Sequence, residues 1–133
     1  MSATRVLVVE DDPSVRGLLH TLLSAEGYDV VTASDGLAGL AGLAGLVKAA
    51  ATKPALMLLE LMMPDLGGVR VLEEVRDDPE LAGTPVIVVT GKVDAVPGMR
   101  DLQCESSVFV KPFAVAELLA RVAEVTGGPD GGQ

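Results

Sequence analysis

The stretch VLVVEDDPSVRGLLHTLLSAEGYDV, residues 6–30, decides how the chain folds. It begins with a short apolar run, which is typical of a strand that is buried on both faces. Apolar residues then recur at positions 15, 18, 19, 22 and 23, the spacing of one face of a helix. Asp12 and Pro13 suit the N-cap and first position of that helix, and Gly27 suits its end. The stretch therefore predicts a strand, a helix and a second strand at residues 29–33.

The same alternation continues along the chain. Short apolar runs at residues 55–59, 86–89 and 108–110 predict three more buried strands. Between them lie helical patterns, of which the most unusual is GLAGLAGLAGLV at residues 36–47, a three-residue repeat. Because a helix has about 3.6 residues per turn, the leucines of this repeat should drift around the helix. Five strands alternating with helices predict an α/β fold, a doubly wound parallel sheet with helices on both faces.

The 133 residues suit one domain of ordinary size. Residues 92–107 break the alternation, because Pro97 and Gly98 lie in their middle, so we expect any helix there to be short or irregular. From Gly127 the sequence GGPDGGQ predicts a flexible tail or linker. We therefore expect a domain over residues 1–126 and a tail over residues 127–133.

The composition restricts the partners and the compartment. A formal net charge of −9 repels nucleic-acid phosphates, so we expect no direct binding of nucleic acid. No apolar run reaches the roughly 18 residues that a membrane span needs, and the N-terminus lacks the layout of a signal peptide. The single Cys104 cannot form an internal disulfide, which agrees with a reducing compartment. These features predict a cytoplasmic protein that does not enter a membrane.

Polar side chains follow four of the predicted strands. At these four strand ends lie Glu10, Asp11 and Asp12, then Glu60, Thr90 and Lys111. The carboxyl ends of parallel strands meet at one edge of the sheet, where such folds place their sites. Clustered carboxylates invite a hard cation such as Mg²⁺, and a lysine and a hydroxyl beside it suit a phosphoryl group. Any one of these residues could be a solvated loop end, but their convergence favours a site.

Four segments at these strand ends resemble the signature blocks of response-regulator receiver domains, the CheY-like family. The segments are VLVVEDDPSVR, LLELMMPDLGG, VIVVTG and VFVKPF, in the order of the family, and the likeness covers about residues 5–125. The resemblance implies a flavodoxin-like three-layer sandwich with strand order 2-1-3-4-5. It also implies a role in two-component phosphorelay signal transduction, and not that of an enzyme.

The resemblance implies a role for individual residues as well. Glu10 and Asp11 would form the acidic pair that binds Mg²⁺ weakly, with Asp11 as the direct ligand. The backbone carbonyl of Met62 would be a further ligand. Thr90 would bind a phosphoryl oxygen, and Lys111 would pair with the phosphate or with the acceptor carboxylate.

Two positions depart from the family pattern. Glu60 stands where the family has its phosphate-accepting aspartate, and its extra methylene moves the carboxylate by roughly 1.5 Å, enough to impair in-line attack. Glu60 would either fold its extra methylene to keep its oxygen at attack distance or pair with Lys111 in the place of phosphate, and it could itself reach the metal. Val108 takes the place of the switch aromatic, and Phe109 should point to the opposite face. Pro112 resembles the cis proline of the family.

We therefore expect an atypical receiver that acts by binding partners. Two versions stay open: a natural pseudo-receiver, or a phosphomimetic state in which Glu60 supplies part of the charge of a phosphate. The expected partners are a sensor histidine kinase or another signalling protein, and an output domain or downstream protein. The latter would bind the face formed by the fourth helix, the fifth strand and the fifth helix. The alternative is a Mg²⁺-dependent phosphatase or phosphotransferase, which the lack of an Asp-x-Asp motif after a strand disfavours.

Overall fold

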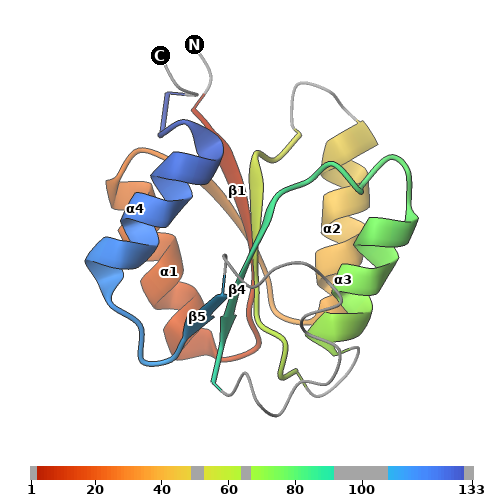
Figure 1. Cartoon of the computed structure of the whole chain (residues 1–133), viewed down its shortest axis with the longest axis horizontal. Helices are drawn as coiled ribbons and strands as arrows, with labels where there is room; N and C mark the ends of the chain where they lie inside the picture. Colours follow the sequence, from red (N-terminus) through yellow and green to blue (C-terminus); the bar gives the residue numbers. More distant parts are fainter. Residues whose placement is uncertain (1–2, 49–52, 64–66, 92–107, 131–133) are drawn as a thin grey trace.

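The computed structural model describes residues 3–48, 53–63, 67–91 and 108–130. Strands and helices alternate from residue 5 to residue 90, and a further strand and helix follow from residue 108 (Figure 1). They are β1 (Arg5–Val9), α1 (Pro13–Ala25), β2 (Asp29–Ala33), α2 (Gly36–Lys48), β3 (Leu56–Leu59), α3 (Gly68–Asp77), β4 (Val86–Thr90), β5 (Val108–Val110) and α4 (Val115–Thr126). No helix in the described ranges is long and apolar enough to cross a membrane. The expected irregular segment at residues 92–107 lies outside the described residues.

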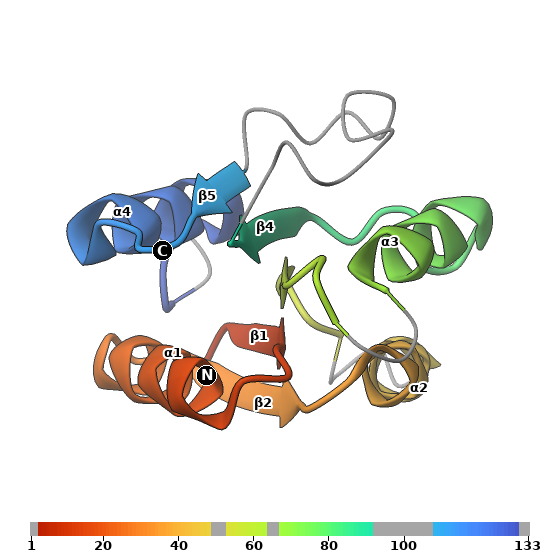
Figure 2. The same cartoon turned by 90° about the horizontal axis from the view of Figure 1, so that it is seen from below.

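The five strands form one parallel sheet in the order β2-β1-β3-β4-β5. Helices α1 and α4 cover one face, and α2 and α3 cover the other (Figure 2). The predicted doubly wound sheet and its strand order are therefore confirmed. Val9 of β1 is in register with Leu59 of β3, and Thr90 of β4 with Val110 of β5. This register brings the residues that follow β1, β3 and β5 to one edge.

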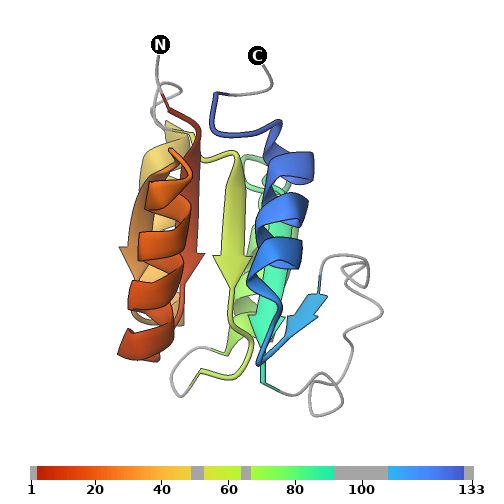
Figure 3. The same ribbon diagram turned by 90° about the vertical axis from the view of Figure 1, so that its left-hand side faces the viewer.

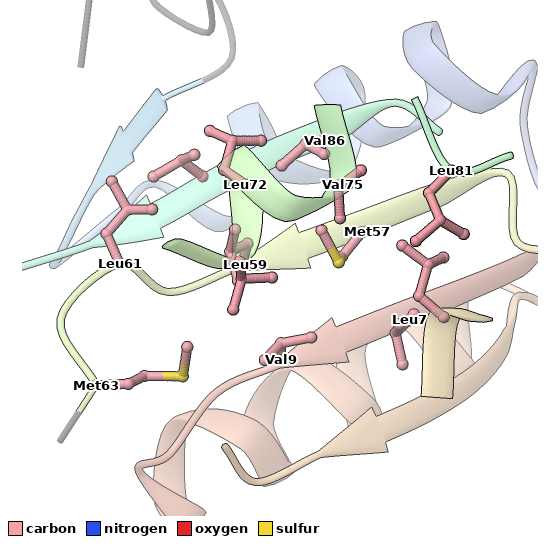
Figure 4. Close-up of a cluster of buried hydrophobic side chains, with 13 residues drawn as sticks. Leu7, Val9, Met57, Leu59, Leu61, Met63, Leu72, Val75, Leu81 and Val86 are labelled. Carbon is pink, nitrogen blue, oxygen red and sulfur yellow. The ribbon is translucent and has the colours of Figure 1, made fainter. Parts of the chain in front are cut away.

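Two hydrophobic clusters hold the layers together, one on each face of the sheet. The cluster beneath α2 and α3 includes Leu7, Met57 and Leu59 from the strands and Leu72 and Val75 from α3 (Figure 4). The cluster beneath α1 and α4 is built in the same way from the alternate strand residues, and its members include Val6, Val8, Leu58, Ile87, Leu19, Leu23, Leu118 and Val122. Because successive side chains of a strand point to opposite faces, continuous apolar runs supply both clusters.

Helix α1 begins and ends where the sequence predicts. The Asp12 carboxylate accepts a hydrogen bond from Ser14 N at 2.8 Å, which satisfies a free amide of the first turn. After the helix, Gly27 has a φ of 102°, a conformation that side chains other than glycine rarely adopt. The chain can therefore turn directly into β2.

The glycine–leucine–alanine repeat forms α2, and its leucines do drift around the helix. Leu37 is 63% exposed, whereas Leu43 is fully buried. Only part of the glycine content is explained by packing. A Cβ atom on Gly39 would lie 2.8 Å from Val9 Cγ1, whereas Gly42 and Gly45 have nothing within 4 Å. Of these three glycines, only Gly39 packs closely against the sheet.

The two ends of the described chain lie side by side, at the edge of the sheet opposite to the carboxyl ends of the strands (Figure 3). Thr4 N donates to Pro129 O, and Thr4 Oγ1 donates to Gly128 O, both at 2.9 Å. These two carbonyls belong to the segment that we expected to be a flexible tail, and the hydrogen bonds hold its first residues in place. The division of the chain at residue 126 stays a prediction.

Candidate functional site

The candidate site lies at the carboxyl edge of the sheet and is centred on one lysine. Glu10 directly follows β1, Glu60 follows β3, and Lys111 follows β5. Lys111 Nζ lies 2.7 Å from Glu10 Oε1 and 2.9 Å from Glu60 Oε1, so that it forms an ion pair with both carboxylates. Of the two arrangements expected for Glu60, the structure has the one in which Glu60 pairs with Lys111, and Glu10 is a second partner of the same lysine.

The second carboxylate oxygen of each glutamate accepts a hydrogen bond from a backbone amide. Glu60 Oε2 accepts from Leu61 N at 2.8 Å, and Glu10 Oε2 accepts from Asp12 N at 3.2 Å. Glu10 is 1% exposed and Glu60 is 5% exposed. Both carboxylates are thus held at both oxygens and nearly withdrawn from solvent, which fixes their positions.

The charges in this cluster do not balance. Two carboxylates face one ammonium, so that one negative charge is left over when both carboxylates are ionised. Burial raises the pKa of Glu10 above its usual value, and the hydrogen bonds from Lys111 and from the Asp12 amide only partly oppose this effect. Burial by itself lowers the pKa of Lys111, but its hydrogen bonds to Glu10 and Glu60 outweigh burial, and the pKa of Lys111 is raised. The lysine is therefore charged at neutral pH.

Thr90 lies at the end of β4, the strand between β3 and β5. It is fully buried, and its hydroxyl has no hydrogen-bond partner in the part of the chain that the structure describes. A buried hydroxyl without a partner costs free energy, and such groups call for an explanation.

Asp11 and Met62, the other expected metal ligands, lie in the loops that follow β1 and β3. Asp11 is half-buried, and Met62 has an exposed side chain. No group of three metal-binding side chains gathers within the described residues. The carboxylates of Glu10 and Asp11 are nevertheless hard oxygen donors, although both oxygens of Glu10 already accept hydrogen bonds, from Lys111 and from the Asp12 amide. This donor set fits Mg²⁺, which often needs only one or two carboxylates plus waters.

Two supporting residues escaped the sequence analysis. Arg16 of α1 donates from Nη1 to Glu10 O at 3.0 Å and to Asp11 O at 3.3 Å, and so braces the acidic loop. Gly68 N donates to Leu61 O at 3.0 Å, and a Cβ atom on Gly68 would lie 2.2 Å from Glu60 O. In the sequence these residues are only a basic residue one turn into α1 and a glycine at the start of α3. Neither pattern indicates which residue the side chain or backbone will contact.

The β5 segment agrees with what the resemblance implied. Val108 packs against the cluster beneath α2 and α3, and Phe109 packs against the cluster beneath α1 and α4. Phe109 therefore points to the face opposite to Val108, as predicted. The Lys111–Pro112 peptide bond is cis.

Comparison with known proteins agrees with this geometry. The family model described as "Response regulator receiver domain" matches residues 6–123. The DNA-binding response regulator MtrA of Mycolicibacterium smegmatis is 37% identical over 119 residues, which cover 89% of this chain and 48% of that protein. Hybrid signal transduction histidine kinase D of Dictyostelium discoideum is 37% identical over 121 residues, which cover 90% of this chain and 7% of that protein.

Solved structures lead to the same family. The chemotaxis protein CheY4 of Vibrio cholerae superposes with a TM-score of 0.75 at 27% identity, covering 93% of this chain and 99% of that one. The chain belongs to the response regulator receiver domain family, whose members are signalling domains of two-component systems. It spans less than half the length of MtrA, so that the activity of a whole regulator does not carry over to it.

Proposed function

We propose that this chain is an atypical receiver in which Glu60 occupies the phosphoacceptor position and its pairing with Lys111 takes the place of phosphate. The proposal rests on one observation, the ion pair of 2.9 Å between Glu60 Oε1 and Lys111 Nζ. Domains of this kind act by presenting a surface to partners, and here the surface would be set without a phosphoryl transfer.

The geometry supports this proposal in two steps. Glu60 Oε1 is already bonded to the ammonium, and Glu60 Oε2 to the amide of Leu61, so attack on a phosphodonor would require one of these bonds to break. The lysine also holds Glu10, which leaves less of its charge for an incoming phosphoryl group. Because misplacement by about 1 Å can cost on the order of 100-fold in rate, such a pocket should accept phosphate poorly.

Mg²⁺ is the cofactor that we propose for this site, bound weakly. Asp11, Glu10 and the backbone carbonyl of Met62 would hold the ion, and Glu60 could contribute as well. When bound, the ion would neutralise charge on phosphoryl oxygens. Thr90 would contribute its free hydroxyl to one of these oxygens, and Lys111 its positive charge.

The proposed partners are a sensor histidine kinase and an output domain or downstream protein. Val110 of β5 and Val115 of α4 are exposed apolar residues, at 48% and 38%, on the side of the molecule formed by β5 and α4. Helix α4 is the helix after β5 and corresponds to the fifth helix of our expectation, whereas a fourth helix would fall at residues 92–107, outside the described ranges. We propose this side as the partner surface. Since the chain carries a net charge of −9, any contact with DNA would be made by another domain or protein.

Phosphorylation by a small donor tests the proposal. The chain and its Glu60→Asp variant are incubated with acetyl phosphate and Mg²⁺, and intact mass is measured. We expect the variant to gain one phosphoryl group under conditions in which the present chain gains none. If the present chain takes up one phosphoryl group stoichiometrically and loses this ability as Glu60→Gln, the domain is an ordinary phosphoacceptor and the proposal fails.

A further inference from the structure

A second hollow lies on the side of the molecule away from the acidic pocket. Helices α2 and α3 pack side by side on one face of the sheet (Figure 2). Between them is a groove of about 390 Å³. Because α3 begins beside Glu60 and runs back along the sheet, its last turn lies near the opposite edge. The groove is therefore separate from the site built around Lys111.

The groove has an apolar floor. Leu40 and Ala44 of α2 and Leu81 of the loop after α3 line it. The hollow exists because α2 offers only short or apolar side chains: residues 36–47 contain glycine, alanine, leucine and valine and no charged residue. An aliphatic segment of about the size of one or two side chains would bury against these residues.

The rim of the groove is acidic, and its charge is compensated only in part, by an ion pair of 3.0 Å between Arg70 and Glu74. Glu74, Asp77 and Asp78 line it, at the end of α3 where the helix dipole is already negative. The Asp77 carboxylate makes no hydrogen bond or ion pair with any residue in the described ranges. Arg76 is basic and in the last turn, but its Nη1 donates to Ala82 O and Thr84 O. An arriving cation would be attracted by both the carboxylates and the dipole.

We propose that the groove between α2 and α3 is a docking site for a basic segment of a partner protein, anchored by an arginine. The aliphatic stem of the arginine would lie on Leu40, Ala44 and Leu81. Its guanidinium group would face Asp77 and Asp78, a carboxylate pair for which its planar donors are suited. The pairing of an apolar floor with an acidic rim is complementary to arginine, which covers apolar surface while its charge stays at the edge.

A second copy of this chain fits the groove less well. Each copy carries a net charge of −9, so that bringing another copy against an acidic rim adds repulsion. A divalent cation alone would satisfy the carboxylates but leave the apolar floor uncovered. The experiment below distinguishes a second copy and a divalent cation from a basic segment.

The experiment titrates the isotope-labelled chain with the peptide acetyl-Ala-Leu-Arg-Leu-Ala-amide, and with a matched peptide in which neutral citrulline replaces arginine. We expect saturable shifts of the Leu40, Ala44 and Leu81 amide signals with the arginine peptide and at least five-fold weaker binding of the citrulline peptide. The double variant Asp77→Asn/Asp78→Asn should weaken binding of the arginine peptide to the same extent. Asparagine at position 78 keeps an oxygen for its hydrogen bond from Glu80 N.

The matched control is the double variant Glu26→Gln/Glu117→Gln, which removes the same charge from exposed positions outside the groove. It should bind the arginine peptide as the unchanged chain does. The proposal would be overturned if both peptides bound equally well, or if both double variants lost the same affinity for the arginine peptide. Amide shifts confined to other surfaces would also overturn it. The proposal also fails if Mg²⁺ alone saturates the Asp77 and Asp78 signals while the peptide has no effect. It fails as well if two copies of the chain form a dimer through the groove.

Discussion

Glu60 Oε1 lies 2.9 Å from Lys111 Nζ, and this ion pair joins the end of β3 to the end of β5 across β4. Together with the Glu10–Lys111 ion pair, it links the ends of three strands, β1, β3 and β5, by charge. The pair is also partly sealed from water, because the glutamate side chain is 6% exposed and the lysine side chain 22%. Interactions of this kind are costly to break on one side only.

Lys111→Met should therefore destabilise the fold by about 3 kcal/mol at neutral pH, because it leaves Glu10 and Glu60 buried without a cation. Glu60→Gln should cost less than about 1 kcal/mol, since Lys111 keeps Glu10 and the charges then balance. Urea unfolding at pH 7 measures both values. Equal losses in the two variants would contradict the assignment of Lys111 as the shared counter-charge.

The raised pKa of Glu10 predicts a stability that falls as pH rises. Above the usual glutamate value of 4.5 and up to the raised pKa, the folded state holds more protons than the unfolded state, so the free energy of unfolding decreases with pH in this window. The raised pKa of Lys111 contributes stability below about 10.5 that is lost as pH rises through its folded value.

Urea unfolding from pH 4 to 8 tests the Glu10 part. The difference between the present chain and Glu10→Gln isolates this residue from the other carboxylates. We expect the gain in stability from Glu10→Gln to grow as pH rises through the window. A difference that stays constant over the whole range would show that Glu10 titrates alike in both states.

The glycines of α2 should respond in opposite directions to alanine. Gly42→Ala and Gly45→Ala should each raise the free energy of unfolding by up to about 1 kcal/mol, because alanine favours helix and nothing lies within 4 Å of the added Cβ atom. Gly39→Ala should lower it, since its Cβ atom would lie 2.8 Å from Val9 Cγ1. Thermal unfolding of the three variants compares them directly, and stabilisation by Gly39→Ala would show that α2 can move away from β1.

Thr90→Val should stabilise the domain by about 1 kcal/mol, because it replaces a buried hydroxyl without a partner by a methyl group. Thr84→Val is a matched control, since the Thr84 hydroxyl is also buried and unpartnered among the described residues but lies in the loop before β4, at the opposite edge. In the Glu60→Asp background, only Thr90→Val should slow uptake of a phosphoryl group. Equal slowing by both variants would argue against a role for Thr90 in the pocket.

The chain should bind Mg²⁺ weakly, and Asp11→Asn should abolish the binding. Asp12→Asn removes the same charge from the neighbouring residue, yet asparagine still caps α1, so that this variant should bind the ion normally. Calorimetric titration with MgCl₂ measures the three proteins. If Asp11→Asn binds as the unchanged chain does, the ion lies elsewhere.

Most of the fold was predictable because it depends on local patterns. Continuous apolar runs indicated the strands buried on both faces, and the residues from Asp12 to Gly27 indicated where α1 begins and ends. The strand order came from the family resemblance, because strand–helix alternation alone does not order the strands. The tail after Gly127 looked flexible from its glycines, whereas its contacts with Thr4 depend on residues more than a hundred positions away.

The candidate site was predictable only in part. The extra methylene of Glu60 made its pairing with Lys111 one of two expected arrangements, since both residues follow strands that end at the same edge of the sheet. The second partner of Lys111 was not expected, because the reach of Glu10 depends on side-chain rotamers that sequence does not define. The fit of Gly68 against Glu60 O depends in the same way on how closely α3 approaches the sheet.

The hydrogen bonds between Thr4 and the Gly128–Pro129 segment have a consequence for protein engineering. They hold the two ends of the described chain within bonding distance of each other, at the edge of the sheet away from Lys111. A short glycine-rich linker could therefore join these ends without strain, and new ends could be opened in the exposed turn at Gly83 between α3 and β4. Such a circular permutant would keep every strand neighbour of the sheet while reversing which half of the chain leaves the ribosome first.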